Sequence, residues 1–262
     1  MSHNPERIVC LTEETTELLY LLGQQDRIVG ISGFTKRPIQ ARSEKPIVSS
    51  FVDAKIDKII DLKPDLVVGF SDIQADIAKQ LIQKGINVWI HNQRTLAEIK
   101  SFIVQMGTLV GARDESLSLI EKFELKVLHI QKRIDEWPIR PRVYFEEWDD
   151  PIISGIAWVS ELVELAGGED IFKTLSQHSL AKDRIISDPK LVCKLDPDII
   201  IASWCGKKFE KQKLIDRQGW KDINAVKRDK VFEIKSEIIL QPGPACLFDG
   251  LELLHELFTK HK

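Results

Sequence analysis

The chain has 262 residues, a formal net charge of −3 at pH 7 and 43% hydrophobic residues, a composition ordinary for a soluble globular protein. Its length suits one large domain or two modest ones. The charge is small and the basic residues do not cluster with aromatics, which excludes a nucleic-acid partner from the expected functions. No apolar run reaches the roughly 18 residues of a membrane-spanning helix, so we expect no membrane insertion.

The first part of the chain alternates short apolar segments with amphipathic ones, a pattern that indicates parallel βαβ units. The predicted strands cover residues 8–11, 27–31, 66–70 and 87–90. The predicted helices cover residues 12–22, 54–62, 72–84 and 95–110, and glycines follow several of them. An irregular polar loop, 33–38, follows the second strand.

A long helix is predicted over 113–137. Its apolar residues recur every three or four positions and form one seam, namely Ile120, Phe123, Val127, Ile130, Ile134 and Trp137. At about 1.5 Å per residue this helix is about 36 Å long. The seam spans barely three heptads, so packing against the body of the protein is favoured over a coiled-coil dimer.

The remainder of the chain repeats the strand and helix alternation. Strands are predicted at 142–145, 198–201 and 231–234, and helices at 158–166, 188–194 and 247–259, with a polar insert at 206–229. The segment Leu62-Lys63-Pro64-Asp65-Leu66-Val67-Val68 has a counterpart in Leu195-Asp196-Pro197-Asp198-Ile199-Ile200-Ile201. A fixed order of elements repeated at long range predicts two similar lobes rather than a short-period solenoid.

The predicted fold class is therefore α/β, with two similar α/β lobes that contain mainly parallel sheets and are joined by one long backbone helix. The predicted domains are an N-terminal lobe at 1–110, the connecting helix at 111–138 and a C-terminal lobe at 139–262. A ligand cleft is expected between the lobes, because small molecules usually bind in clefts between domains.

Candidate ligand-binding residues follow the strands, since ligands of parallel sheets gather beyond the carboxyl ends of the strands. Aromatic faces hold a flat ligand, while polar groups fix its orientation. The predicted binding residues are Phe34, Arg37, Phe70, Asp72, Gln74, His91, Arg94, Glu146, Trp148, Trp204 and Lys207.

Each candidate also has a structural explanation. Asp72 opens a helix and fits a capping role, and the tryptophans fit core positions. Glu146 and Glu147 are neighbours on a strand and point to opposite faces, so they do not form an acid/base pair. Cys205 would need a base such as His91 to act as a nucleophile. No catalytic residue and no metal ligand set is predicted, and no glycine-rich phosphate loop is present.

The chain resembles the substrate-binding proteins of ABC importers for vitamin B12, haem and ferric siderophores. The residues that carry this resemblance are Arg7–Leu18, Asp26–Gly30, Lys63–Val67 and Gly85–Val88 in the first half, and Arg142–Tyr144, Gly167–Phe172 and Asp196–Ile200 in the second. The resemblance implies two lobes joined by a backbone helix, a ligand held between them, and cleft aromatics at Phe34 and Phe70. Cobalamin or a metal chelate is then the expected ligand, and an ABC permease is the expected partner of an exported form.

Segments 70–76, 145–148 and 203–207 are similar to a leaderless branch of this family named for cobalamin binding. Residues 1–7 do not have the pattern of a secretory signal, so we expect a cytoplasmic protein, or a periplasmic one if a leader was removed. The expected function is small-ligand binding without chemistry. The alternative is a cytosolic enzyme that acts on a small polar substrate in the same cleft.

Overall fold

The computed structural model describes residues 4–261 and divides into two compact units. The first unit comprises the chain through Gln93, together with Ala97–Lys122 and Gln241–Pro244. The second comprises Arg94–Leu96, Phe123–Leu240 and the chain from Ala245 onward. Both units are α/β with mainly parallel strands, as the sequence predicts.

The first unit contains a five-stranded parallel sheet with strand order β3-β2-β1-β4-β5. Its strands are β1 (Ile8–Cys10), β2 (Ile28–Ser32), β3 (Ile47–Ser49), β4 (Leu66–Phe70) and β5 (Val88–His91). Its helices are α1 (Glu13–Leu21), α2 (Ala41–Glu44), α3 (Ile56–Asp61), α4 (Ala75–Gln83) and most of α5 (Leu96–Leu109). The carboxyl ends of all five strands therefore lie along one edge of this sheet.

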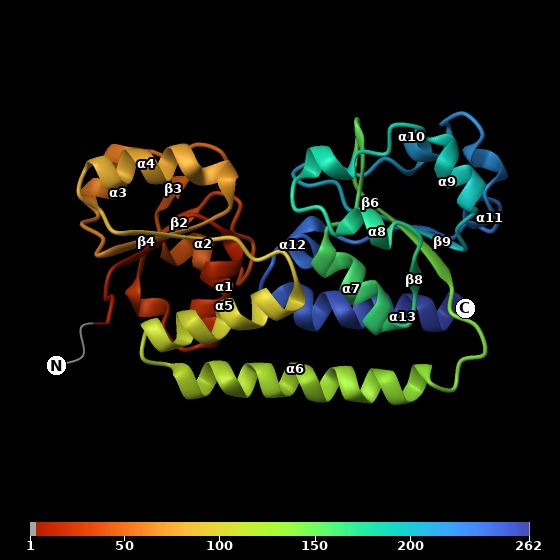
Figure 1. Ribbon diagram of the computed structural model, residues 1–262. Coiled ribbons are helices and arrows are strands. Elements are labelled where there is room, and N and C mark those ends of the chain that lie inside the picture. Colours follow the sequence, from red (N-terminus) through yellow and green to blue (C-terminus); the bar gives the residue numbers. More distant parts are fainter. Residues whose placement is uncertain (1–3, 262) are drawn as a thin grey trace. The chain divides into compact units, whose positions relative to one another are not determined.

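Helices cover both faces of this sheet, with α3 and α4 on one side and α1 and α5 on the other (Figure 1). On the α3–α4 side a buried apolar cluster joins the strands to the helices, and its members are Val9, Leu11, Val48, Ile59, Val67, Ile77 and Leu81. Continuous burial along β4 is what a strand covered on both faces requires.

The second unit contains a mixed sheet with order β10-β9-β6-β7, and β8 pairs with β6. Its strands are β6 (Arg142–Asp149), β7 (Ile152–Ser154), β8 (Glu169–Asp170), β9 (Ile199–Ala202) and β10 (Val231–Glu233). Its helices are α7 (Ala157–Ala166), α8 (Lys173–Ser176), α9 (Lys190–Leu195), α10 (Lys211–Ile215), α11 (Asn224–Lys227), α12 (Ser236–Ile239) and α13 (Leu251–His261). Only β7 runs antiparallel, because a tight turn at Asp150-Pro151 returns the chain directly to β6.

One face of this second sheet is covered by α9, α10 and α11 and the other by α7 and α13 (Figure 1). The cluster beneath α9–α11 is rich in aromatic and branched residues, including Tyr144, Ile200, Trp204, Leu214 and Trp220. The polar insert predicted at 206–229 is therefore a structured cover for the sheet, since it contains α10 and α11.

The repeated Pro-Asp sequence has the same structural role in both units. The Asp65 carboxylate accepts hydrogen bonds from the backbone N–H groups of Glu6 and Arg7, at 2.7 and 3.1 Å. In the second unit the Asp198 carboxylate accepts one from the backbone N–H of Arg142 at 2.9 Å. In each case the aspartate ties the start of a central strand to its neighbour, so the sequence repeat reflects a repeated structural device.

The long helix α6 covers Arg113–Ile134 and ends three residues earlier than predicted. The backbone N–H of Trp137 bonds to the carbonyl of Ile134 at 3.0 Å, so the chain tightens just before Pro138. A residue that precedes proline avoids the α-helical region, which explains the early end. Phe123, Ile130 and Ile134 of the predicted seam are buried.

The helix predicted at 72–84 is also shorter than expected. Residues Asp72–Gln74 form a 3-10 turn, η2, and the α-helix begins at Ala75. The Ser71 hydroxyl caps this turn by accepting the N–H of Ile73 at 3.4 Å, and the side chain of Gln74 turns back toward the strand. Strands β3 and β7 were not predicted, because each is only three residues long and lies next to proline.

Candidate functional site

In the first unit, the predicted site residues lie where β2, β4 and β5 end. These strands are parallel to one another or to β1, so the loops that follow them share one edge of the sheet. The loop after β2 contains Phe34 and Arg37, while Phe70 and His91 are the last residues of β4 and β5. The side chains differ greatly in exposure, and this difference decides which of them a ligand can reach.

Phe34 presents the most accessible aromatic ring of these residues. It is 47% exposed and makes an edge contact with Phe51, with ring centroids 6.5 Å apart. The backbone N–H of Phe34 donates to the Ser32 hydroxyl at 3.2 Å. An exposed ring on a backbone that is held in place is suited to contact an apolar ligand surface.

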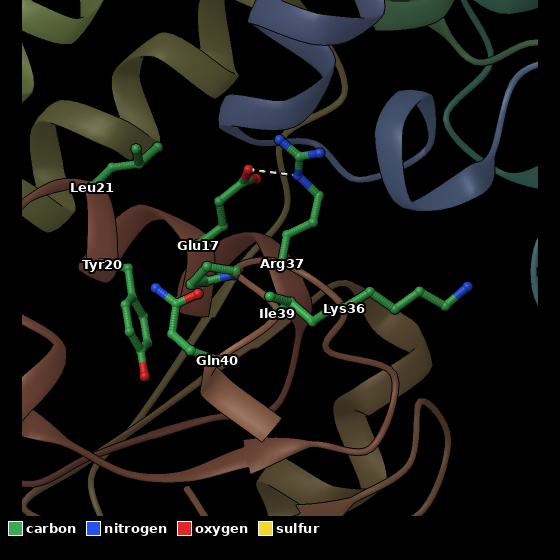
Figure 2. Close-up of a pocket in the computed structure, with 8 residues that line it drawn as sticks. Glu17, Tyr20, Leu21, Lys36, Arg37, Ile39 and Gln40 are labelled. Atoms are coloured by element: carbon green, nitrogen blue, oxygen red, sulfur yellow. Dashed lines mark hydrogen bonds and ion pairs between the residues drawn. The ribbon is translucent and has the colours of Figure 1, made fainter. Parts of the chain in front are cut away.

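Two buried glutamates of α1 hold this loop. The Glu13 carboxylate accepts the backbone N–H of Lys36 at 2.9 Å, and Arg37 Nε lies 2.8 Å from Glu17 Oε1. Arg37 and Glu17 line a cavity of about 480 Å³. Figure 2 shows them with other residues that line it, namely Tyr20, Leu21, Lys36, Ile39 and Gln40. Arg37 was predicted to orient a ligand, and the structure gives it an ion pair within the protein as well.

The carboxyl groups at the start of α1 are an additional feature that the site prediction did not include. Glu13 and Glu14 are 3% and 1% exposed. Burial raises the pKa of Glu13 to about 8 and that of Glu14 to about 7. Gly243, in the segment Gln241–Pro244 of the same unit, packs against Glu14 so closely that a methyl group added to it would meet the Glu14 Cβ at 2.5 Å.

His91 is buried at 5% exposure, and its ring nitrogens have partners within the unit. Nδ1 lies 2.7 Å from Gln93 Oε1, and Nε2 lies 3.3 Å from the Thr15 hydroxyl and 3.6 Å from Glu14 Oε1. Burial lowers the pKa of His91 to about 4, so the imidazole is neutral at pH 7. Its ring packs against Phe102, with centroids 4.1 Å apart.

Gln74 fastens three chain segments together at the same edge. Its Oε1 accepts the backbone N–H of Phe70 at 3.0 Å, and its Nε2 donates to the carbonyls of Leu11 and Phe51 at 3.2 and 3.1 Å. The side chain is completely buried. These bonds give Gln74 a structural role, and its predicted contact with a ligand stays a prediction.

Phe70 is 6% exposed, and its ring lies 5.5 Å from that of His91. Asp72 is exposed and lines a largely apolar cavity of about 540 Å³ beside α4. Arg94 belongs to the second unit and is partly buried, and its carbonyl accepts the N–H of Trp158 at 3.0 Å. The structure therefore brings Phe70, Gln74 and His91 together.

In the second unit, Glu146 is a fully buried carboxylate with three partners. It accepts hydrogen bonds from the Tyr144 hydroxyl at 2.9 Å and the Trp204 indole N–H at 3.0 Å. Arg217 approaches both oxygens, with Nη2 2.9 Å from Oε1. Glu147 pairs instead with Arg184 at 2.7 Å, so the two neighbouring glutamates have different partners.

Trp148, Trp204 and Lys207 lie together at the carboxyl ends of β6 and β9. Lys207 Nζ is 5.2 Å from the centre of the Trp148 ring and 5.4 Å from that of Trp204, distances typical of cation–π contacts. The same ammonium lies 2.6 Å from Asp149 Oδ1. Trp204 itself is only 3% exposed.

Sequence reasoning missed Asp149, Lys213 and Arg217, which complete this cluster. The two basic residues lie in the polar insert, where no strand or motif marks them. Within residues 4–261, no three His, Cys, Asp or Glu side chains come together in a way that could hold a metal ion. No helix in the described part of the chain is long and apolar enough to cross a bilayer.

Two α/β units, each with polar and aromatic side chains at the carboxyl edge of a mainly parallel sheet, are typical of proteins that bind small molecules. Residues 8–238 match the family described as periplasmic binding protein, and the chain belongs to this family.

Its relatives include an uncharacterized ABC transporter substrate-binding lipoprotein, YvrC, of Bacillus subtilis, which is 27% identical over 96% of this chain and 79% of its own length. A vitamin B12-binding protein of Vibrio parahaemolyticus is 24% identical over 94% of this chain and 88% of its own. Among solved structures, a periplasmic heme binding protein from Pseudomonas aeruginosa has the same fold, with a TM-score of 0.82 and 17% identity over 98% of this chain and 94% of its own.

Proposed function

We propose that the chain binds a small molecule reversibly at the carboxyl edges of its sheets, as a substrate-binding protein of the ABC-importer type. The named relatives support this, since one is an ABC substrate-binding lipoprotein, one binds vitamin B12 and one binds heme. Cobalamin, haem and ferric chelates are therefore the first ligands to test. Glu146 and His91, which an enzymatic alternative would use for proton transfer, both have partners inside the units.

The single observation that carries this proposal is the Phe34 loop. A ring that is 47% exposed gains free energy when a ligand buries it, by about 25 cal/mol for each Å² of apolar surface removed from solvent. Its loop is fixed by Glu13 and Glu17 before any ligand arrives, which reduces the entropy lost on binding.

The test is thermal stabilisation by cyanocobalamin, haemin and a ferric siderophore, combined with mass spectrometry of molecules that co-purify with the protein. A bound ligand raises the melting temperature by mass action. Phe34→Ala is expected to weaken binding about tenfold or more, because the ring is the contact surface. Ile139→Ala is the control, since Ile139 is 77% exposed and precedes the amino end of β6, whereas the candidate residues lie at the carboxyl ends of strands. Equal affinities of the two variants would refute the role of Phe34.

The partner and the cellular location of the protein are tested in cells. We propose an ABC permease as the partner that receives the ligand from an exported form of the protein, because one relative is named an ABC transporter substrate-binding lipoprotein. The expected cytoplasmic location stays a prediction. Fractionation of cells that express the native gene tests the location, and uptake of the identified ligand in a deletion strain tests the transport role.

A further inference from the structure

Two lysine ammonium groups share one buried carboxylate at the carboxyl edge of the second unit. Asp149 is the last residue of β6, and its side chain is not exposed. Lys207 Nζ lies 2.6 Å from Oδ1 and 2.8 Å from Oδ2. Lys213 Nζ also donates to Oδ2. Because both ammonium groups reach the same oxygen atom, they lie within two hydrogen-bond lengths of each other and repel.

The charges around this pair do not balance locally. The other buried carboxylate, Glu146, is paired with Arg217, so Asp149 is the buried counter-charge of both lysines. Burial opposes ionisation of Asp149, but the hydrogen bonds from Lys207 and Lys213 hold its pKa below the usual value. Glu210 also acts on Lys213, but it is exposed, where solvent and salt screen its charge.

Both ammonium groups remain accessible. The Lys207 and Lys213 side chains are 35% and 48% exposed, whereas the carboxylate beneath them is inaccessible. An ammonium group carries three N–H donors, and Asp149 takes one from Lys213. Donors that remain can therefore bond to a group arriving from the solvent side.

The position of Lys207 is fixed by aromatic rings. Its ammonium lies over Trp148 and Trp204, and Lys213 Nζ is 5.8 Å from the centre of the Trp204 ring. A long side chain normally loses rotamer freedom when it binds an anion. Here the ion pair and the ring contacts have already restricted both lysines, so less entropy remains to be lost.

We propose that Lys207 and Lys213 form a subsite for an oxyanion group, a carboxylate or a phosphate, on the ligand. The oxyanion is the second counter-charge that the lysine pair lacks, and it binds as a charge-assisted hydrogen-bond acceptor. This inference rests on the proposed function, because it describes one chemical group of the small molecule that the protein binds. It selects anionic ligands over neutral ones of similar size.

The experiment uses the full chain with inorganic phosphate and citrate as probes, titrated by isothermal calorimetry and tryptophan fluorescence. We expect saturable binding of at least one probe, and binding about tenfold weaker or more in Lys213→Met, since a charge-assisted hydrogen bond is lost. Lys211→Met is the matched control: Lys211 belongs to the same helix but pairs with Asp229 at 2.6 Å. Binding of phosphate would indicate a phosphate subsite, and binding of citrate would indicate a carboxylate subsite.

Several outcomes overturn the subsite. The subsite is refuted if neither probe shows saturable binding. It is also refuted if Lys213→Met and Lys211→Met bind a probe with equal affinity. Lys213→Arg keeps the charge and should bind the probe more tightly than Lys213→Met does, which separates loss of charge from loss of structure. If an identified ligand stabilises the unmodified chain and Lys213→Met equally, the subsite fails while the proposed function stands. If no small molecule stabilises the unmodified chain, the proposed function fails instead.

Discussion

Arg217→Met is predicted to destabilise the second unit strongly, because it leaves a buried carboxylate without its cation. Glu146 has no exposed surface, and the Arg217 guanidinium contacts both of its oxygens. Removing one partner of a buried ion pair typically costs about 3–5 kcal/mol. The Tyr144 hydroxyl and the Trp204 indole still donate to Glu146, so we expect a value near the lower end, about 3 kcal/mol.

Urea unfolding followed by tryptophan fluorescence measures this loss. Of the six tryptophans, only Trp89 belongs to the first unit, so the signal reports mainly on the second. With a urea slope of about 2 kcal/mol per molar, a loss of about 3 kcal/mol lowers the midpoint by about 1.5 M. An unchanged slope would show that the denatured state is unaffected.

Two further variants control the interpretation. Lys211→Met breaks an exposed pair with Asp229 and is expected to cost less than about 1 kcal/mol. In Glu146→Gln/Arg217→Met the buried charge is absent, so this double variant should be more stable than Arg217→Met alone. The reasoning is refuted if Arg217→Met unfolds at the same urea concentration as Lys211→Met.

The remaining predictions concern the first unit. Burial raises the pKa of Glu13 to about 8 from its ordinary value of 4.5. Protonated Glu13 therefore contributes its full stabilisation below about pH 4.5, and this contribution is lost as the pH rises through about 8. In the Glu13→Gln variant, the melting temperature should fall less between about pH 6 and pH 8.5 than in the unmodified chain. The same pH dependence of the melting temperature in both proteins would contradict this prediction. The contribution of His91 to stability has the opposite pH dependence, because burial lowers its pKa from 6.5 to about 4. Neutral His91 stabilises the unit above pH 6.5, and this stabilisation is lost as the pH falls through about 4. In thermal melts over that acid range, a His91→Gln variant should therefore lose less stability than the unmodified chain. Gln74→Ala removes three hydrogen bonds of a buried side chain and should lower the free energy of unfolding by about 2–3 kcal/mol, measured by urea unfolding followed by circular dichroism. The exposed control Gln80→Ala should change it by less than about 0.5 kcal/mol, and equal losses in the two variants would rule out the proposed role of Gln74.

The alternation of strands and helices could be predicted because each unit buries its central strands on both faces. Strands such as Leu66–Phe70 and Ile199–Ala202 are continuous apolar runs, a pattern typical of parallel sheets covered by helices. The Pro-Asp repeat marked equivalent positions in the two units, since Asp65 and Asp198 each cap the start of a neighbouring strand. Short edge strands such as Ile47–Ser49 have too few residues to show periodicity.

The candidate site was harder to predict, because the partners of a strand-end residue lie far away in the sequence. The position of Glu146 directly after the four-residue predicted strand 142–145 suggested a ligand contact, but its cation, Arg217, is 71 residues further along the chain. The same holds for Gln74, whose partner Leu11 is 63 residues away. A sequence pattern places both side chains at the correct edge of a sheet, yet only the folded chain shows that their polar atoms already have partners.

The difference between buried, paired side chains and partly exposed ones also indicates which residues determine the selectivity for a ligand. Polar side chains that are buried and paired within a unit, such as Glu146 and Gln74, cannot exchange partners without losing the bonds that hold the edge together. Side chains that are partly exposed, such as Phe34, Lys207 and Lys213, can gain a partner without breaking any bond. A change of ligand among related chains is therefore expected to involve the second group. Exchange of Phe34 or Lys213 should alter the ligand preference and leave the stability of the unit within about 1 kcal/mol, whereas exchange of Glu146 should affect stability first.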